Sequence, residues 1–170
     1  MTAPILRVAR RVAMAIGIGR QTADTDESRT TATVQVALPG SELRSDVPMV
    51  QLYGYASRPV PGSDLIVLFQ GGDRSRGVAI ASGDQRNRPN DLQPGEVCLF
   101  HPRTGSRIWM KDDGSILIAP QNGKTAIVGD LDVSGIMTGG EVVAQDVKLS
   151  THPHGGVQAG SAQSGAPIPQ

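Results

Sequence analysis

Two histidines near the C-terminus, His152 and His154, carry the most distinctive chemistry of the sequence. In an extended chain, residues two apart point to the same side, with Cα atoms about 6.5 Å apart. Two imidazoles are too few for a complete metal site, since a structural zinc site takes four ligands. If three chains meet at this point, six imidazoles converge. The motif therefore raises a question of assembly as well as of metal.

The other candidate side chains favour structural roles. His101 has no second histidine nearby in the sequence, and residues 112–114 (Asp-Asp-Gly) are typical of a hairpin turn without the further ligands of a calcium loop. Residues 71–74 (Gly-Gly-Asp-Arg) lack the Lys-Ser/Thr of a phosphate-binding loop, so they indicate a β-turn. Cys98 is the single cysteine and lies in an apolar run, which predicts a buried, inert thiol.

The overall composition excludes some classes of function. The 16 Lys and Arg residues balance 16 Asp and Glu residues, so a broad basic surface for nucleic acid or anionic membrane is not indicated. Aromatic residues make up only 3% of the chain, whereas there are 21 glycines and 12 prolines. A monomeric core would have few large side chains to bury. This composition suits thin, repetitive β structure or intertwined oligomers.

The first hundred residues predict a short helix followed by strands. Residues 5–17 place apolar side chains on one stripe and three arginines off it, which is typical of an amphipathic helix that ends at the glycines of positions 17 and 19. About five short strands separated by Gly/Pro turns follow, among them residues 31–38 and 64–69, and residues 95–100 are expected to close the set. The pattern favours a small antiparallel barrel, with the OB-fold as the leading candidate.

The segments after residue 106 are shorter, and small residues dominate them. Asp-Gly and Asn-Gly turns separate the pieces, so one chain would bury little apolar area. Three copies wound around one axis would bury their inward side chains together and remove the exposed strand edges. Residues 106–150 are therefore predicted to form an elongated trimeric β-prism or β-helix. The Gly/Ser/Pro-rich tail from residue 155 is predicted to be disordered or to form a cap that packs back on the shaft.

Four stretches of the chain resemble the central spike, or baseplate assembly protein V, of contractile-tailed bacteriophages, especially its Mu-like branch. They are residues 53–59 (YGYASRP), 69–80 (FQGGDRSRGVAI), 88–89 (RP) with 94–96 (PGE), and 151–157 (THPHGGV). The resemblance implies an all-β chain with four parts. These are an N-terminal helix and linker (1–29), an OB-fold (30–105), a trimeric β-helical shaft (106–150), and a metal-binding apex with a C-terminal cap (151–170).

The resemblance also implies a metal centre. Members of this type hold one iron ion at the apex through a His-x-His motif from each of three chains, and His152 and His154 occupy that motif. Six neutral imidazoles suit iron and leave no open position, so such a site would clamp chains together instead of catalysing a reaction. Asp146, the shaft aspartate closest to the apex, is the first candidate for a second, hard cation such as calcium.

The implied role is that of a structural virion protein and not of an enzyme. Three copies would form a needle at the tip of the tail baseplate, assembled in the host cytoplasm. The needle would dock to the tail hub and pierce the host outer membrane when the sheath contracts.

Two alternatives come from other classes of protein. An OB-fold module for single-stranded nucleic acid or oligosaccharide would need a basic groove with stacking aromatics. The sequence offers it four rings: Tyr53, Tyr55, Phe69 and Phe100. A metalloenzyme built on the two C-terminal histidines would need a third ligand and an open coordination position, and neither is evident.

Overall fold

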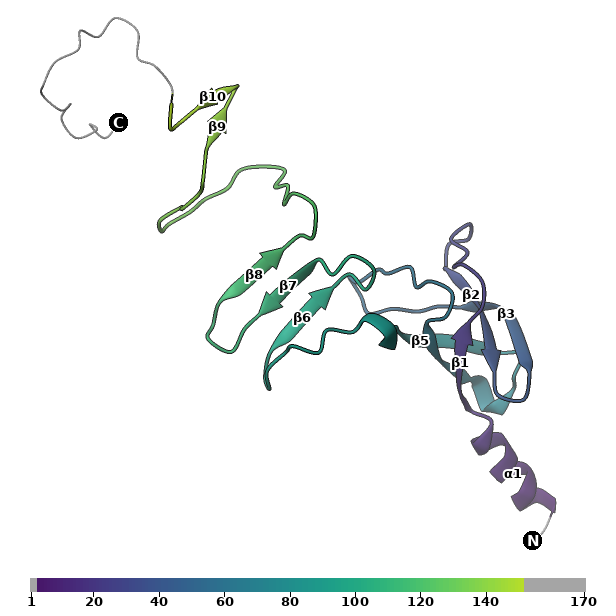
Figure 1. The fold of residues 1–170 in the computed structure, drawn as a ribbon. Coiled ribbons are helices and arrows are strands. Elements are labelled where there is room, and N and C mark those ends of the chain that lie inside the picture. Colours follow the sequence, from purple (N-terminus) through teal and green to yellow (C-terminus); the bar gives the residue numbers. More distant parts are fainter. Residues whose placement is uncertain (1–2, 152–170) are drawn as a thin grey trace, which may run out of the picture. The chain divides into compact units, whose positions relative to one another are not determined.

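A computed structural model of the chain describes residues 3–151 (Figure 1). The chain divides into two units, Met1–Thr125 and Ala126–Gln170. The first unit contains one α-helix, a five-stranded sheet and a three-stranded sheet. Its elements are α1 (Ala3–Ala13), β1 (Ile16–Gln21), β2 (Thr33–Leu38), β3 (Glu42–Pro48), β4 (Asp64–Phe69), β5 (Gly77–Gly83), β6 (Val97–Phe100), β7 (Arg107–Met110) and β8 (Ile116–Ala119), with 3-10 turns η1 (Gln70–Gly72) and η2 (Gln85–Asn87). No described helix is long and apolar enough to cross a bilayer.

The five-stranded sheet is antiparallel and has the order β3-β2-β1-β4-β5. It curls on itself (Figure 1), and register shifts in β2 and β4 add to the twist. Side chains alternate in direction along β2 and β4, so every second residue of each strand points into the core of the sheet. The buried core consists of Val34, Val36, Leu38, Val47, Met49, Leu65, Val67, Phe69 and Ala79.

Strand β1 is so closely packed between β2 and β4 that a side chain at two of its positions would meet its neighbours; at Gly17 the nearest of these is the Phe69 ring, 2.8 Å from a Cβ atom. A Cβ atom on Gly19 would lie 2.3 Å from the carbonyl oxygen of Ala37, and one on Gly17 would lie 2.9 Å from Leu38 Cδ2. The prediction of a helix through residue 17 was therefore wrong at its C-terminal end, because these glycines serve a strand and do not cap a helix. Residues before position 30 thus supply the central strand of the sheet.

The three-stranded sheet is an antiparallel meander in the order β6-β7-β8. Strand β6, which was expected to close the barrel, pairs with β7 instead. Residues 112–114 form the turn between β7 and β8, as predicted, and Asp113 accepts hydrogen bonds from the Ser115 amide at 2.8 Å and hydroxyl at 2.6 Å.

One face of the meander is covered by the preceding loop. Trp109 is only 8% exposed, and its indole N–H donates to Glu96 at 2.9 Å. Arg107 lies 4.1 Å from the same ring and pairs with Asp91 at 2.8 Å. These contacts tie the loop to β7 and leave the opposite face of the sheet without a cover from this loop.

The described part of the second unit has no core of its own. It contains one small hairpin, β9 (Val143–Ala144) and β10 (Val147–Lys148), and every described residue from 126 to 151 is exposed. The prediction of an all-β chain with a short N-terminal helix is confirmed. The assignments to an OB-fold and to a β-helix remain predictions.

Candidate association surfaces and metal site

The two predicted iron ligands, His152 and His154, lie outside the described residues. Asp146 lies in the turn between β9 and β10, exposed and with a φ of 68°, beside Gln145 with a φ of 49°. Aspartate tolerates this left-handed conformation better than most residues. Within residues 3–151 no group of three or more His, Cys, Asp or Glu side chains could hold a metal ion. A cation at Asp146 would therefore need ligands from outside residues 3–151 of one chain.

A carboxylate that the sequence did not single out closes the hairpin that carries Asp146. Glu141 accepts hydrogen bonds from the Ser150 amide at 3.2 Å and from the Ser150 hydroxyl. The hydroxyl contact is the first cause of a lowered pKa for Glu141. The two residues bracket the hairpin, so the chain is clasped directly before the two histidines. Nothing local in the sequence signals a contact between residues nine positions apart.

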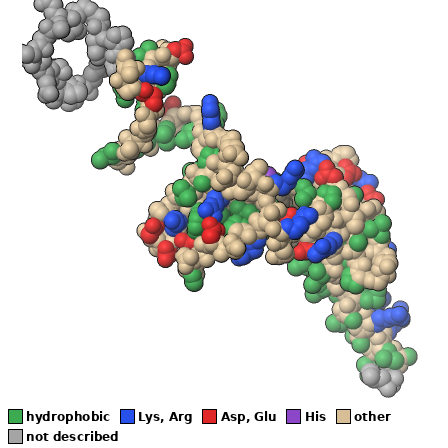
Figure 2. All heavy atoms as spheres, in the orientation of Figure 1, with side chains coloured by type: hydrophobic (Ala, Val, Ile, Leu, Met, Phe, Trp, Pro, Cys, Tyr) green, Lys and Arg blue, Asp and Glu red, His purple; other side chains and the backbone are tan. Residues whose placement is uncertain are grey.

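The uncovered side of the meander is a continuous aliphatic surface, here called the aliphatic face. The register places three residues side by side in each of two rows. The face consists of Val97, Met110 and Ile116 in one row and Leu99, Ile108 and Ile118 in the other. All six are between 40% and 66% exposed, and apolar side chains reach the surface in this part of Figure 2. A contiguous apolar patch of this kind is typical of a surface that associates with another molecule.

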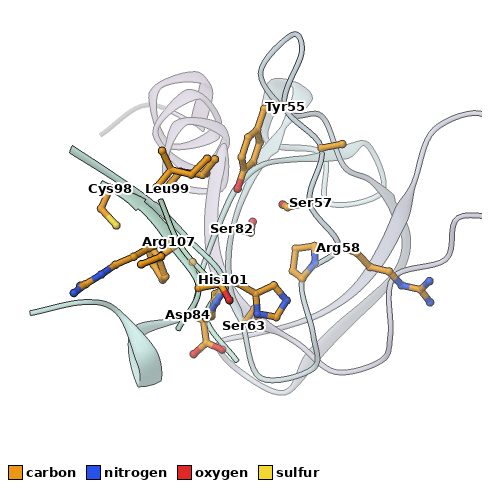
Figure 3. A pocket seen from close by; sticks show the side chains of 18 of the residues that line it. Tyr55, Ser57, Arg58, Ser63, Ser82, Asp84, Cys98, Leu99, His101 and Arg107 are labelled. Atoms are coloured by element: carbon orange, nitrogen blue, oxygen red, sulfur yellow. The ribbon is translucent and has the colours of Figure 1, made fainter. Parts of the chain in front are cut away.

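An open groove of about 970 Å³ runs between the meander and the loops of the five-stranded sheet (Figure 3). Leu99 and Tyr55 belong to its walls. Its charged groups are engaged by neighbours: Arg58 pairs with Asp24 at 2.6 Å, and Arg107 pairs with Asp91. The groove therefore extends the aliphatic face and presents few free charges.

Two further groove residues test expectations from the sequence. His101 Nδ1 accepts a hydrogen bond from the Thr104 amide at 3.2 Å, which is a local structural role. Cys98 is only half-buried and lines the groove, so the prediction of a buried thiol was wrong. Within residues 3–151 of one chain, the two faces of this three-stranded sheet are not both covered.

The aromatic side chains do not assemble into a stacking platform. Phe69 is 2% exposed and belongs to the core, where Arg74 lies 4.3 Å from its ring. Phe100 is half-buried, which leaves Tyr53 and Tyr55 as the exposed rings of the four. This arrangement weakens the case for a nucleic-acid or oligosaccharide module, since stacking supplies much of the binding energy in such sites.

Two family models match the chain at opposite ends. The model described as Bacteriophage Mu Gp45, N-terminal, matches residues 21–86, which hold most of the five-stranded sheet. The GpV Apex motif matches residues 146–167, a segment that begins at Asp146 and contains both histidines. The two matches support a Mu-like central spike protein. The resemblance seen in the sequence is thereby confirmed.

Individual members of the Mu-like spike family are also similar to this chain. The baseplate puncturing device gp45 of Escherichia phage Mu is 33% identical over 93 residues, which cover 55% of this chain and 47% of that protein. The Mu-like prophage FluMu protein gp45 of Haemophilus influenzae is 25% identical over 155 residues, covering 80% of this chain and 81% of that protein. The match to the phage Mu protein therefore spans about half of its length.

Proposed function

We propose that three copies of this chain form the central spike of a contractile-tail baseplate and pierce the host outer membrane when the sheath contracts. The support is the match to two family models of Mu-like spike proteins and the similarity to a phage Mu protein that is named a baseplate puncturing device. The role is structural and not enzymatic, and its place is the tail baseplate of the virion. The N-terminal end of the spike docks to the tail hub.

The observation that carries the trimer is the aliphatic face. Complete burial of one such side chain contributes about 1.5–3 kcal/mol, so burial of the remaining exposed half contributes about 1 kcal/mol for each. Six side chains on each copy provide a driving force that one chain in water leaves unused. Three aliphatic faces turned toward one axis would cover each other and form the upper part of the shaft.

The segment after the meander supports the same arrangement. Its apolar residues are exposed in the single chain, for example Val128 at 100% and Ile136 at 94%. Ordering such a segment costs about 1–2 kcal/mol per residue in backbone entropy, and no core in the described part of this unit offsets that cost. Contacts with two further copies would offset it. On this proposal residues 106–150 are the trimeric shaft, which strand β6 joins, and the rest of residues 30–105 is the OB-fold, to which β1 is added.

The apex carries a metal clamp in this proposal. His152 and His154 from three copies supply six imidazole nitrogens, a donor set that suits iron and leaves no position for a substrate. The clamp joins the three chains where strand pairing ends. Asp146, which sits at the tip of its hairpin, would bring three carboxylates together for a second, hard cation such as calcium.

The decisive experiment is the mass of the purified chain in solution. Sedimentation equilibrium should give three times the 17.8 kDa of one chain, and sedimentation velocity should give the high friction of an elongated particle. A compact monomer would contradict the proposal. Elemental analysis of the same sample should give one iron per three chains.

A further inference from the structure

Helix α1 presents an apolar stripe that nothing in the described structure covers. None of its 11 residues is buried, and Ile5, Val8 and Val12 are 56%, 62% and 70% exposed. Their spacing of three and four residues puts them on one side of the helix. Figure 2 shows apolar side chains exposed along the helix, beside a group of basic ones. Burial of such a stripe against another apolar surface would stabilise the helix.

The helix is held to the sheet at its last turn and projects away from it (Figure 1). The Phe69 amide donates to the Ala15 carbonyl at 2.7 Å, directly after the helix. The carbonyl of Arg11 lies against Gly72, where a Cβ atom would come within 2.3 Å of it. These contacts fix the direction of the helix, so its first turns do not fold back on the sheet of the same chain.

The outer side of the sheet carries a second uncovered apolar surface, here called the outer patch. Strands β1 and β4 place Ile16 opposite Leu68 and Ile18 opposite Ile66. These four side chains are 61%, 41%, 65% and 39% exposed, respectively. The next pair along the strands is the Arg20–Asp64 ion pair at 3.3 Å, which borders the patch.

We propose that helix α1 of one copy packs across the outer patch of the next copy. The inference rests on the trimer of the proposed function and names the contact between its N-terminal parts. A helix stripe and a sheet face are natural partners, since both bury apolar area in a two-layer arrangement. The contact joins two different surfaces, and repeated head to tail it closes into a ring when three copies are present.

One contact of this kind covers both surfaces at once. A bundle of three α1 helices, or insertion of the helix into a membrane, would leave the outer patch in water. The chain carries the two surfaces in matching size, about one helix stripe of three large side chains against a patch of four. A second copy is therefore the occupant that satisfies both.

Cysteine cross-linking of the full-length chain tests this contact. In a Cys98→Ser background, Val8→Cys combined with Ile66→Cys should give covalently linked trimers on non-reducing gels after mild oxidation, because a disulfide needs Cα atoms within about 7 Å. Arg7→Cys with Ile66→Cys is the matched control, because position 7 lies off the stripe. It should give at least tenfold less linked product.

The outcomes separate this inference from the proposed function. A chain that is trimeric before oxidation but forms no linked species with Val8→Cys and Ile66→Cys would overturn the helix contact alone. Equal linking by Val8→Cys without its partner cysteine would also overturn it, in favour of helix–helix contact. A monomer before oxidation would overturn both proposals.

A second measurement guards against variants that misfold. Ile18→Glu on the outer patch should raise amide hydrogen exchange in α1 at least tenfold while β2 and β3 keep their protection. Unchanged exchange in α1 would count against the contact.

Discussion

Gly71 and Gly72, which lie near the C-terminal end of helix α1, have different structural roles. Gly71 and Gly72 both have a positive φ, 61° and 74°, which disfavours any residue with a side chain. Only Gly72 also touches the helix, since nothing lies within 4 Å of a Cβ atom placed on Gly71. A comparison of the two positions therefore distinguishes the backbone conformation that the turn requires from the packing of the turn against the helix.

The matched substitutions Gly71→Ala and Gly72→Ala test this difference. Gly71→Ala should lower the free energy of unfolding by about 1–2 kcal/mol, the cost of a left-handed conformation. Gly72→Ala should lower it further and should displace α1, because the Arg11 carbonyl would have to move. Urea unfolding gives the first quantity and amide hydrogen exchange in α1 reports the second. Equal effects of the two variants would show that the helix does not depend on this contact.

Glu42 links two arginines at the edge of the five-stranded sheet. Its carboxylate lies 2.7 Å from Arg44 and 3.2 Å from Arg74, which in turn stacks on the buried Phe69 ring. The hydrogen bond from Arg44 is the main reason why the pKa of Glu42 lies below its ordinary value of 4.5, and the nearby Arg74 charge adds to it. The carboxylate therefore stabilises the folded state at any pH above the ordinary pKa, and this contribution disappears as the pH falls through the lowered pKa.

The variant Glu42→Gln should accordingly show a pH-dependent loss of stability. At pH 7 its free energy of unfolding should be lower than that of the native chain by up to about 1 kcal/mol, the usual range for a partly exposed ion pair. Once the pH has fallen below the lowered pKa of Glu42, the two proteins should converge as the native carboxylate becomes protonated. Urea unfolding at the two pH values measures this, and a deficit that is the same at both would argue against an electrostatic role.

Among the elements, the β6–β8 meander has two faces that differ in what covers them within one chain. The face that contains Trp109 is held by the loop from residue 88 to 96. The aliphatic face has neither charge nor hydroxyl, and the exposed half of its apolar surface contributes nothing to the stability of the single chain. Because the two faces alternate along each strand, a one-residue change of position moves a substitution from one face to the other.

This alternation offers a matched test of the trimer interface. Ile108→Asp places a charge on the aliphatic face, at a site 40% exposed in the single chain, and should shift the protein from trimer toward monomer. Leu117→Asp introduces the same charge at a site 42% exposed on the opposite face and should leave the trimer intact. Mass by light scattering distinguishes the outcomes. A trimer that survives Ile108→Asp and not Leu117→Asp would assign the interface to the other face.

Metal binding belongs to the scale of the whole molecule, because one chain contributes only two of six proposed ligands. The chain has three histidines, so the third, His101, is a control for any loss of imidazole. Its role within one chain is the hydrogen bond with the Thr104 amide.

The double variant His152→Ala with His154→Ala should lose the bound iron and remain trimeric, because the aliphatic faces and the shaft still associate. His101→Ala should keep the iron. Elemental analysis and sedimentation equilibrium on the three proteins measure both effects. Iron retained at the native level in the double variant would contradict the assignment of these ligands.

Local patterns in the sequence determined much of this protein. The strands at residues 33–38 and 64–69 were predictable because alternation, apolar runs and Gly turns act over a few residues. The spike family was predictable for the same reason, since its stretches are short and continuous.

The tertiary structure decided what depends on contacts between distant segments. The local sequence predicts that Gly19 ends a helix. In the structure it lies in the central strand β1, against the carbonyl of Ala37. The clasp of Glu141 on Ser150 and the half-exposed position of Cys98 arise in the same way. A residue's own type sets which backbone conformations it allows, but only its neighbours in space decide which of them is adopted and which faces stay uncovered.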